Sequence, residues 1–171
     1  MQVEIEAATR EQQPVLANLL ELYTHDFSEI LDVQLGADGR FGYADLPLYW
    51  QEHNRHPFLI KADGQLAGFA LVRQGSLVSG DNDVWDISEF FILRGYRKRG
   101  IGMQAVHHVW RKFPGAWEVR VMDKNAGARE FWSHAIARFM GAVVVPTFYE
   151  PKRWNVFSFD TRLRKQASTN S

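Results

Sequence analysis

Hydrophobic and polar residues follow each other along this chain with two different periods. Residues 2–8 alternate with a period of two, which is typical of a short strand. Residues 15–23 carry hydrophobic side chains at helical spacing, and Thr9 with Gln12 forms the pattern of a capping box before them. Between residues 25 and 45 the pattern breaks down among glycines and aspartates, so we expect a loop there.

The middle of the chain predicts a hairpin and then a strand that leads into a helix. Residues 46–53 suit a short helix with a proline in its first turn. Two strand-like runs, residues 57–61 and 66–72, flank a polar segment with Asp-Gly at its tip, which favours a hairpin. Residues 84–93 form an apolar strand, and residues 101–113 continue with the stripe of an amphipathic helix.

The pattern of residues 116–171 predicts the last strands and helix of the fold. Residues 116–122 alternate as a strand with two different faces, and residues 125–140 carry a helical stripe. Residues 142–145 and 154–159 are interpreted as two closing strands, and residues 166–171 as a frayed polar tail. Together these elements predict a mixed α/β fold with a largely antiparallel central sheet and helices on both of its faces.

Composition narrows the possible functions. The 171 residues suit a single domain, which we expect to span residues 1–165. The net charge is zero, which argues against a protein that binds nucleic acid or an anionic membrane through a global basic field. Cysteine is absent, which excludes disulfides, thiolate nucleophiles and cysteine-based metal sites. No apolar run has the length of a membrane span, so we expect a cytoplasmic protein.

The turn before the second long helix has the composition of an anion site. It carries three cations and two glycines, in the order Arg97, Lys98, Arg99, Gly100, Ile101 and Gly102. The first N–H groups of a helix have no intrahelical acceptor, and the helix dipole favours an anion beside them. A strand that leads through glycines into a helix is therefore expected to hold a phosphate group.

Two segments carry a resemblance to a known family. The pattern Arg97-x-x-Gly100-x-Gly102 after a hydrophobic strand resembles the acetyl-CoA signature of the GCN5-related N-acetyltransferase (GNAT) superfamily. The later segment Asn125-x-x-Ala128-x-x-Phe131-Trp132 resembles the start of the helix that follows the fifth strand in that superfamily. The likeness covers residues 57–159. Within the superfamily, Trp117-Glu118-Val119-Arg120 and Phe90-Phe91 resemble an uncharacterised subgroup of predicted acetyltransferases.

The resemblance implies a binding mode for acetyl-CoA as co-substrate. Main-chain N–H groups of the turn are implied to hold the pyrophosphate, and main-chain groups at the end of the preceding strand to meet the pantetheine arm and the thioester carbonyl. Asn125 is implied to lie beside the same arm. The residues assigned to acetyl-CoA are Phe90, Phe91, Ile92, Arg97, Lys98, Arg99, Gly100, Ile101, Gly102, Met103, Asn125 and Trp132.

Two carboxylates are candidates for the general base that an amine acceptor needs. Asp86 lies where histone-modifying relatives carry a catalytic glutamate, and Glu89 interrupts an apolar strand end. In a regular strand, residues three apart face opposite sides, so a bulge would be needed for both to point at one site. A structural salt bridge is the alternative for either residue. We favour Glu89 because it is closer to the expected thioester.

The sequence also departs from the family at two positions. Trp132 stands where many relatives carry a tyrosine that protonates the leaving thiolate, and an indole cannot give up its proton at physiological pH. An unassisted thiolate, another acid (Tyr149 or His134) and lost activity remain open. Arg120 stands where some relatives carry a glutamate base, which closes that route.

These observations lead to one function and its rivals. We expect transfer of an acetyl group from acetyl-CoA to a primary amine, on a small molecule or a peptide, by direct attack. The residues that lie where the superfamily builds its acceptor cleft are Tyr23, Asp26, Phe27, Glu29, Tyr43, Tyr49 and Trp50, and the first three are the candidates for contact with the acceptor. No metal site is expected, because the histidines lack a third ligand at fixed spacing. The alternative is a non-catalytic acyl-CoA sensor, and a nucleic-acid binder is disfavoured. The acceptor and the oligomeric state, including a homodimer, stay open.

Overall fold

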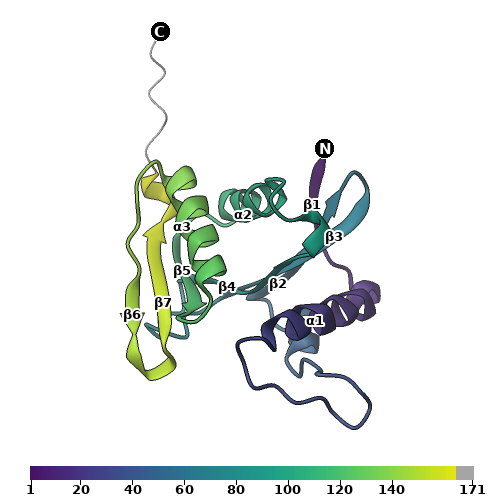
Figure 1. Cartoon of the computed structure of the whole chain (residues 1–171). Coiled ribbons are helices and arrows are strands. Elements are labelled where there is room, and N and C mark those ends of the chain that lie inside the picture. Colours follow the sequence, from purple (N-terminus) through teal and green to yellow (C-terminus); the bar gives the residue numbers. More distant parts are fainter. Residues whose placement is uncertain (165–171) are drawn as a thin grey trace. The chain divides into compact units, whose positions relative to one another are not determined.

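The computed structural model describes residues 1–164; residue 165 and the predicted tail at 166–171 lie outside the described residues. Within residues 1–164 the chain forms both α-helices and strands (Figure 1). The helices are α1 (Gln13–Phe27), α2 (Ile101–Lys112) and α3 (Ala126–Met140). The strands are β1 (Val3–Ala7), β2 (Arg55–Ala62), β3 (Gln65–Gln74), β4 (Trp85–Ile92), β5 (Ala116–Met122), β6 (Thr147–Tyr149) and β7 (Trp154–Asp160).

The strands belong to a seven-stranded sheet in the order β1-β2-β3-β4-β5-β7-β6. Antiparallel pairing joins β1 to β2, β2 to β3, β5 to β7 and β6 to β7. The pair β4–β5 is parallel and aligns Trp85 with Trp117 and Asp86 with Glu118. The predicted mixed α/β fold with a largely antiparallel sheet is therefore confirmed.

The chain divides into two compact units. Unit 1 consists of Met1–Arg73 and Ser88–Gly102. Unit 2 consists of Gln74–Ile87 and the described residues from Met103 onward. The strand β4 thus contributes its first three residues to unit 2 and the rest to unit 1. The strand β4 and the turn that follows it carry most of the predicted site residues.

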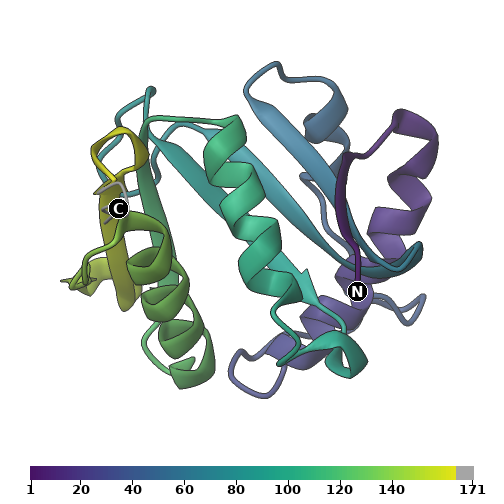
Figure 2. The same cartoon turned by 90° about the horizontal axis from the view of Figure 1, so that it is seen from above.

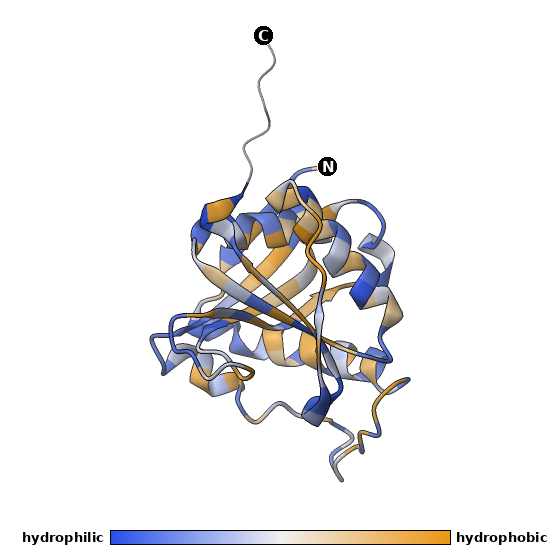
Figure 3. Ribbon diagram, turned by 90° about the vertical axis from the view of Figure 1, so that its left-hand side faces the viewer, coloured by the Kyte–Doolittle hydropathy of each residue, from blue (hydrophilic) through white to orange (hydrophobic). Residues whose placement is uncertain are grey.

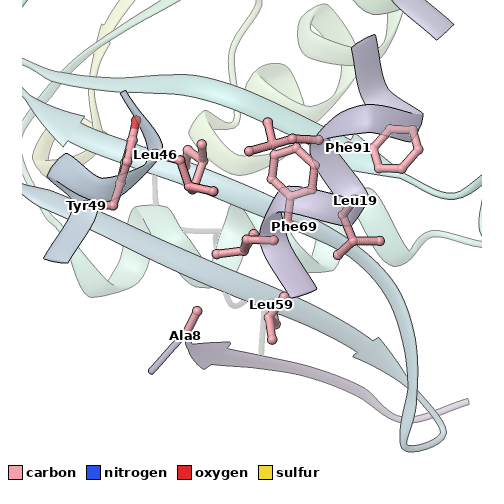
Figure 4. Packing of buried hydrophobic residues seen from close by; sticks show 10 residues of the cluster. Ala8, Leu19, Leu46, Tyr49, Leu59, Phe69 and Phe91 are labelled. Carbon is pink, nitrogen blue, oxygen red and sulfur yellow. The ribbon is translucent and has the colours of Figure 1, made fainter. Parts of the chain in front are cut away.

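The core of unit 1 lies between α1 and its strands. Leu16, Leu19 and Leu20 of α1 are buried at helical spacing, as the sequence predicts. Burying each leucine contributes roughly 1.5–3 kcal/mol. They pack with Phe69 of β3 and Phe91 of β4, and Figure 4 shows Leu19 beside these two rings. This packing fixes the C-terminal end of β4 relative to α1.

A close backbone approach holds β3 against the end of β4. A Cβ atom added to Gly68 would lie 2.0 Å from the carbonyl oxygen of Phe91, so only glycine fits at this position. The N–H of Leu93 donates to the carbonyl of Ala67 over 2.8 Å just beyond. Ala67 and Gly68 of β3 therefore lie directly against the end of β4, where the loop to α2 begins.

The core of unit 2 is aromatic. Val106, Val109 and Trp110 of α2 are fully buried, and the Trp110 ring lies 5.2 Å from that of Phe159 on β7. Along β5, buried and half-buried residues alternate as predicted. Figure 2 shows α3 next to β5 and β7 within this unit. In Figure 3, orange residues follow the strands and blue residues occupy several connections.

Two predicted elements differ from those observed. Residues 142–145 are not a strand, and Val143 and Val145 are 78% and 79% exposed. The strand that pairs with β7 is β6, which begins after Pro146. The predicted short helix at 46–53 is a 3-10 helix, Leu46–Trp50.

Candidate active site

The turn between β4 and α2 is a sharply bent loop that leads directly into the start of a helix. A short 3-10 helix, Arg94–Tyr96, follows β4, and α2 begins at Ile101. Lys98 and Gly100 both adopt the left-handed region, with φ of 60° and 77°. The chain therefore turns sharply just before the helix, and the N–H groups of the first helical turn have no intrahelical acceptor. The predicted order of strand, loop and helix is confirmed.

The side chain of Arg97 fastens this loop to the rest of unit 1. Its Nε donates to the carbonyl of Ile92 over 2.7 Å, and a terminal nitrogen donates to Asp26 over 2.6 Å. The guanidinium also lies 5.7 Å from the centre of the Phe91 ring. The side chains of Lys98 and Arg99 are exposed. Arg97 thus shapes the loop, while the two neighbouring cations face solvent.

Asp26, predicted to lie in the acceptor cleft, holds two arginines. It sits in the last turn of α1 and accepts hydrogen bonds from Arg94 over 2.7 and 3.1 Å as well as from Arg97. Partial burial raises the pKa of Asp26, but the hydrogen bonds from Arg94 and Arg97 outweigh it and lower the pKa overall. Its role in this structure is to tie the end of α1 to the loop after β4.

The carboxylate of Glu89 accepts hydrogen bonds from two tyrosines. Tyr23 on α1 donates to Oε2 over 2.5 Å, and Tyr43 donates to Oε1 over 3.0 Å. The Tyr23 ring lies 4.7 Å from Phe27 and 5.9 Å from Phe91, centre to centre. Burial and the neighbouring Glu89 carboxylate raise the pKa of Tyr43 above its usual value, so it remains a donor. The Glu89 carboxylate therefore lies next to aromatic rings.

A residue that the sequence analysis did not single out positions Tyr43. Both carboxylate oxygens of Glu21 accept main-chain hydrogen bonds, from the N–H groups of Phe41 and Gly42, each over 2.8 Å. Glu21 lies on α1, two residues before Tyr23. In the sequence, Glu21 is only an acidic residue two positions before Tyr23, and this pattern does not predict which groups it binds. Gly42 adopts φ of 72° where the chain turns.

Asp86 has a different environment from Glu89. Its side chain is 1% exposed, and both of its oxygens accept hydrogen bonds from Arg120 over 3.0 and 2.8 Å. The Arg120 guanidinium in turn lies 4.7 Å from the centre of the Trp154 ring. Asp86 therefore makes a buried, bidentate ion pair within unit 2. Asp86 thus forms a structural salt bridge, which was the alternative to a role as general base.

The predicted acetyl-CoA residues of unit 2 have structural partners. Asn125 is the N-cap of α3 rather than its first helical residue, and its Oδ1 accepts from the N–H of Ala128 over 3.0 Å. Trp132 is buried, with its ring 6.3 Å from that of Trp110. Of the other candidate acids, Tyr149 stacks on Trp154, and His134 is exposed.

The structure brings one group of predicted residues together in unit 1. Glu89, Tyr23, Phe27 and Phe91 are connected by hydrogen bonds or ring contacts, and Asp26 with Arg97 follows at the end of α1. Phe91 and Ile92 are buried, whereas Phe90 is half-buried.

Among residues 1–164, no group of three or more histidine, aspartate or glutamate side chains could hold a metal ion. In the same range no helix has the length and apolar character needed to span a membrane.

Comparison with known proteins identifies the family. Residues 16–135 match the sequence model of the acetyltransferase (GNAT) family. The chain belongs to this family and is an acyltransferase that takes its acyl group from coenzyme A. No curated protein sequence matches the chain.

Several solved structures share the fold. An acetyltransferase from Thermus thermophilus aligns with a TM-score of 0.72 at 15% identity, over 94% of this chain and 97% of that one. The PaiA N-acetyltransferase from Thermoplasma acidophilum, solved with coenzyme A, aligns with a TM-score of 0.66 at 11% identity, over 94% and 99%. The ribosomal-protein-S18-alanine N-acetyltransferase from Escherichia coli gives 0.58 at 14% identity, over 99% of both chains. At these identities the likeness supports the fold alone.

Proposed function

We propose that this protein transfers an acetyl group from acetyl-CoA to a primary amine by direct attack, with Glu89 as the general base. The observation that carries this proposal is the Glu89 carboxylate, held by two tyrosine hydroxyls on the strand that leads into the Arg97–Gly102 loop. We assign the activity to one N-acetyltransferase domain spanning residues 1–165.

The loop fits the pyrophosphate of acetyl-CoA. Its left-handed residues, Lys98 and Gly100, turn the chain so that successive N–H groups precede α2. We assign the N–H groups from Lys98 through Met103 to the pyrophosphate, and main-chain groups of Phe90–Ile92 to the pantetheine arm. Asn125 and Trp132 keep their assignment to acetyl-CoA within this proposal. When bound, acetyl-CoA supplies the thioester carbonyl that the amine attacks.

Glu89 has the capacity to accept the proton of the incoming amine. An ionised carboxylate offers about four lone-pair sites, and Tyr23 and Tyr43 each donate to one of its oxygens. We assign to the Glu89 carboxylate the proton of the ammonium group, which it accepts through a water molecule and so leaves the amine lone pair for attack. The new C–N bond forms as the C–S bond breaks. The thiol of coenzyme A, with a pKa near ~8.5, leaves acceptably as a thiolate without an acid at Trp132.

The surroundings of Glu89 favour a cationic amine as acceptor. The Tyr23 ring, whose hydroxyl binds Glu89, lies within 5.9 Å of the rings of Phe27 and Phe91, so aromatic surface adjoins the carboxylate. A carboxylate attracts an ammonium group, and aromatic rings attract it further through cation–π interactions. We therefore expect amines that are protonated at neutral pH to be preferred over uncharged aromatic amines.

Thiol release with a panel of primary amines tests this proposal. We expect Glu89→Gln to lower kcat about 100-fold and to leave the acetyl-CoA affinity, measured by calorimetry, unchanged. The lost rate should partly return at high pH, where the amine deprotonates by itself. Glu6→Gln is the matched control, because it removes a carboxylate of β1 that pairs with Lys61 of β2. A Glu89→Gln enzyme as fast as the parent at neutral pH would remove Glu89 from the role of base.

A second function has one observation in its favour. Trp132 is buried where many relatives are expected to carry a tyrosine acid, and its indole gives up no proton at neutral pH. A non-catalytic acyl-CoA sensor has no use for such an acid. Acetyl-CoA binding by calorimetry without thiol release for any amine in the panel would establish the sensor in place of the transferase.

A further inference from the structure

The Glu89 carboxylate accepts more hydrogen bonds from the protein than the role of a general base requires. Each of its oxygens accepts a hydrogen bond from a tyrosine hydroxyl, one from Tyr23 on α1 and one from Tyr43, which lies shortly before the 3-10 helix Leu46–Trp50. These residues are 66 and 46 positions away from Glu89 along the chain. Two separate parts of unit 1 therefore converge on one side chain of β4.

The second of these parts is fixed by α1. Glu21 binds the N–H groups of Phe41 and Gly42 with one oxygen each, which holds the backbone immediately before Tyr43. A single helix thus places Tyr23 directly and places Tyr43 through Glu21. Tyr23 supplies one hydroxyl itself, and Glu21 on the same helix holds the segment that carries the other.

We propose that Tyr23 and Tyr43 are positioning residues for acyl transfer, whose hydroxyls fix the orientation of Glu89 and keep it ionised, and that Glu21 places the second hydroxyl. This inference rests on the proposed function and extends it to three residues outside the acetyl-CoA loop. Hydrogen bonds donated to a carboxylate stabilise its charged form, so each hydroxyl makes Glu89 a weaker base that is available at lower pH. The same bonds select one rotamer and aim the remaining lone pairs.

The other ionisable groups near this cluster have roles of their own. Asp45 and Tyr49 both act on Tyr43, and each raises its pKa further after burial and Glu89. Asp26 is one turn beyond Tyr23 on α1, and Arg94 and Arg97 both bind it. Arg94 and Arg97 are thus paired with Asp26. The hydroxyls of Tyr23 and Tyr43 are donors that reach the Glu89 oxygens over the distances given above.

The test measures the titration of Glu89 itself. Carbon-13 labelling of glutamate side chains gives a carboxyl signal that is assigned to Glu89 by its loss in Glu89→Gln. We expect the midpoint of this titration to rise by about one pH unit in Tyr23→Phe and in Tyr43→Phe, and by about two in the double variant. The acid limb of kcat should move upward by the same amounts, with the KM for acetyl-CoA unchanged.

Glu21 is tested through its dependence on Tyr43. Glu21→Ala should raise the Glu89 midpoint as much as Tyr43→Phe does. In the Tyr43→Phe background, Glu21→Ala should add no further shift, because the hydroxyl that it positions is already gone. Glu6→Gln is the control, since this variant removes an ion pair elsewhere in unit 1 and should leave the midpoint in place. Circular dichroism verifies that each variant is folded.

The outcomes separate this inference from the proposed function. An unmoved Glu89 midpoint in both tyrosine variants overturns the positioning role, whether or not amines are acetylated. Additive shifts from Glu21→Ala and Tyr43→Phe overturn the role of Glu21. Raised midpoints without thiol release for any amine leave the ionisation of Glu89 as inferred and overturn the acetyl transfer. Full activity of Glu89→Gln overturns the base and, with it, the positioning of that base.

Discussion

Two carboxylates on one strand have opposite surroundings, and single-residue variants should tell them apart. Asp86 is 1% exposed and makes a bidentate pair with Arg120. Glu89 is half-buried and binds tyrosine hydroxyls. Removing one partner of a buried pair leaves the other charge uncompensated, which costs about 3–5 kcal/mol. We expect Asp86→Asn to lose about this much free energy of unfolding in urea, whereas Glu89→Gln loses far less.

A matched double variant checks the reason for that loss. Asp86→Leu combined with Arg120→Met removes both charges and should restore most of the stability, because no buried charge is left unpaired. An Asp86→Asn protein with the stability of the parent would show that the pair contributes nothing, and Asp86 would return as a candidate base.

Asn125 combines an observed role with a proposed one, and two variants separate them. Its Oδ1 caps α3 through the N–H of Ala128, while its amide N–H₂ group is the proposed donor to the pantetheine arm. Asn125→Asp keeps the cap and removes that donor, so we expect normal stability and a loss of about 0.5–1.5 kcal/mol in coenzyme A binding. Asn125→Ala should in addition lose about 1 kcal/mol of stability. Unchanged affinity of Asn125→Asp in calorimetry would exclude the amide as a ligand.

At the scale of elements, the loop between β4 and α2 is tested by comparing two glycines of equal conformation. Gly100 and Gly64 both have φ of 77°, so aspartate strains the backbone equally at either position. Gly64 lies at the tip of the β2–β3 hairpin, with open space around an added Cβ. We expect Gly100→Asp to abolish the rise in Tm that acetyl-CoA causes in the parent, because a carboxylate then faces the pyrophosphate. Gly64→Asp should keep that rise, and its loss in both variants would indicate strain alone.

The elements themselves were largely predictable, because their signals are local. The loop after β4 could be located from Gly100, Gly102 and the amphipathic stripe behind them, and the hairpin from Asp63-Gly64. The valines at 142–145 led to a wrong strand, since β-propensity reports the fit to a pleated surface and not the presence of a partner. In the structure Val143 and Val145 are exposed, and the partner of β7 begins at Thr147.

At the scale of the whole molecule, the contacts of the candidate site were less predictable than its residues. Glu89, Tyr23 and Asp26 could all be named from the sequence as candidates. Their pairing could not, because Glu89 meets tyrosines 66 and 46 positions away, and no periodicity relates such distant residues. For the same reason the ion pairs of Asp26 with Arg94 and Arg97, 68 and 71 positions away, could not be predicted from the sequence. Tertiary packing decides which of the candidate side chains become neighbours.

At the scale of the whole molecule, stability should fall in two separate pH ranges, one set by histidines of unit 2 and one by an aspartate of unit 1. In unit 2, burial lowers the pKa of His107, whose Nε2–H donates to the carbonyl of Ala135 over 2.9 Å. Burial followed by the charges of Lys112 and Arg111 lowers the pKa of His108. The unfolded chain therefore binds protons below a pH of about 6.5 that the folded chain refuses, and stability falls as the pH drops through this window.

Asp26 in unit 1 acts at lower pH with the same sign. Its pKa is lowered in the folded state, so its contribution is present above the unfolded value of 3.8 and is lost as the pH falls through the folded value. We expect urea unfolding between pH 7 and 5.5 to show a slope of at most about 1.4 kcal/mol per pH unit for each histidine. His107→Gln should flatten that slope, whereas Asp26→Asn should leave it unchanged and flatten the curve only as the pH falls below the unfolded value of 3.8. A slope between pH 7 and 5.5 that survives the replacement of both histidines would place its origin in other groups.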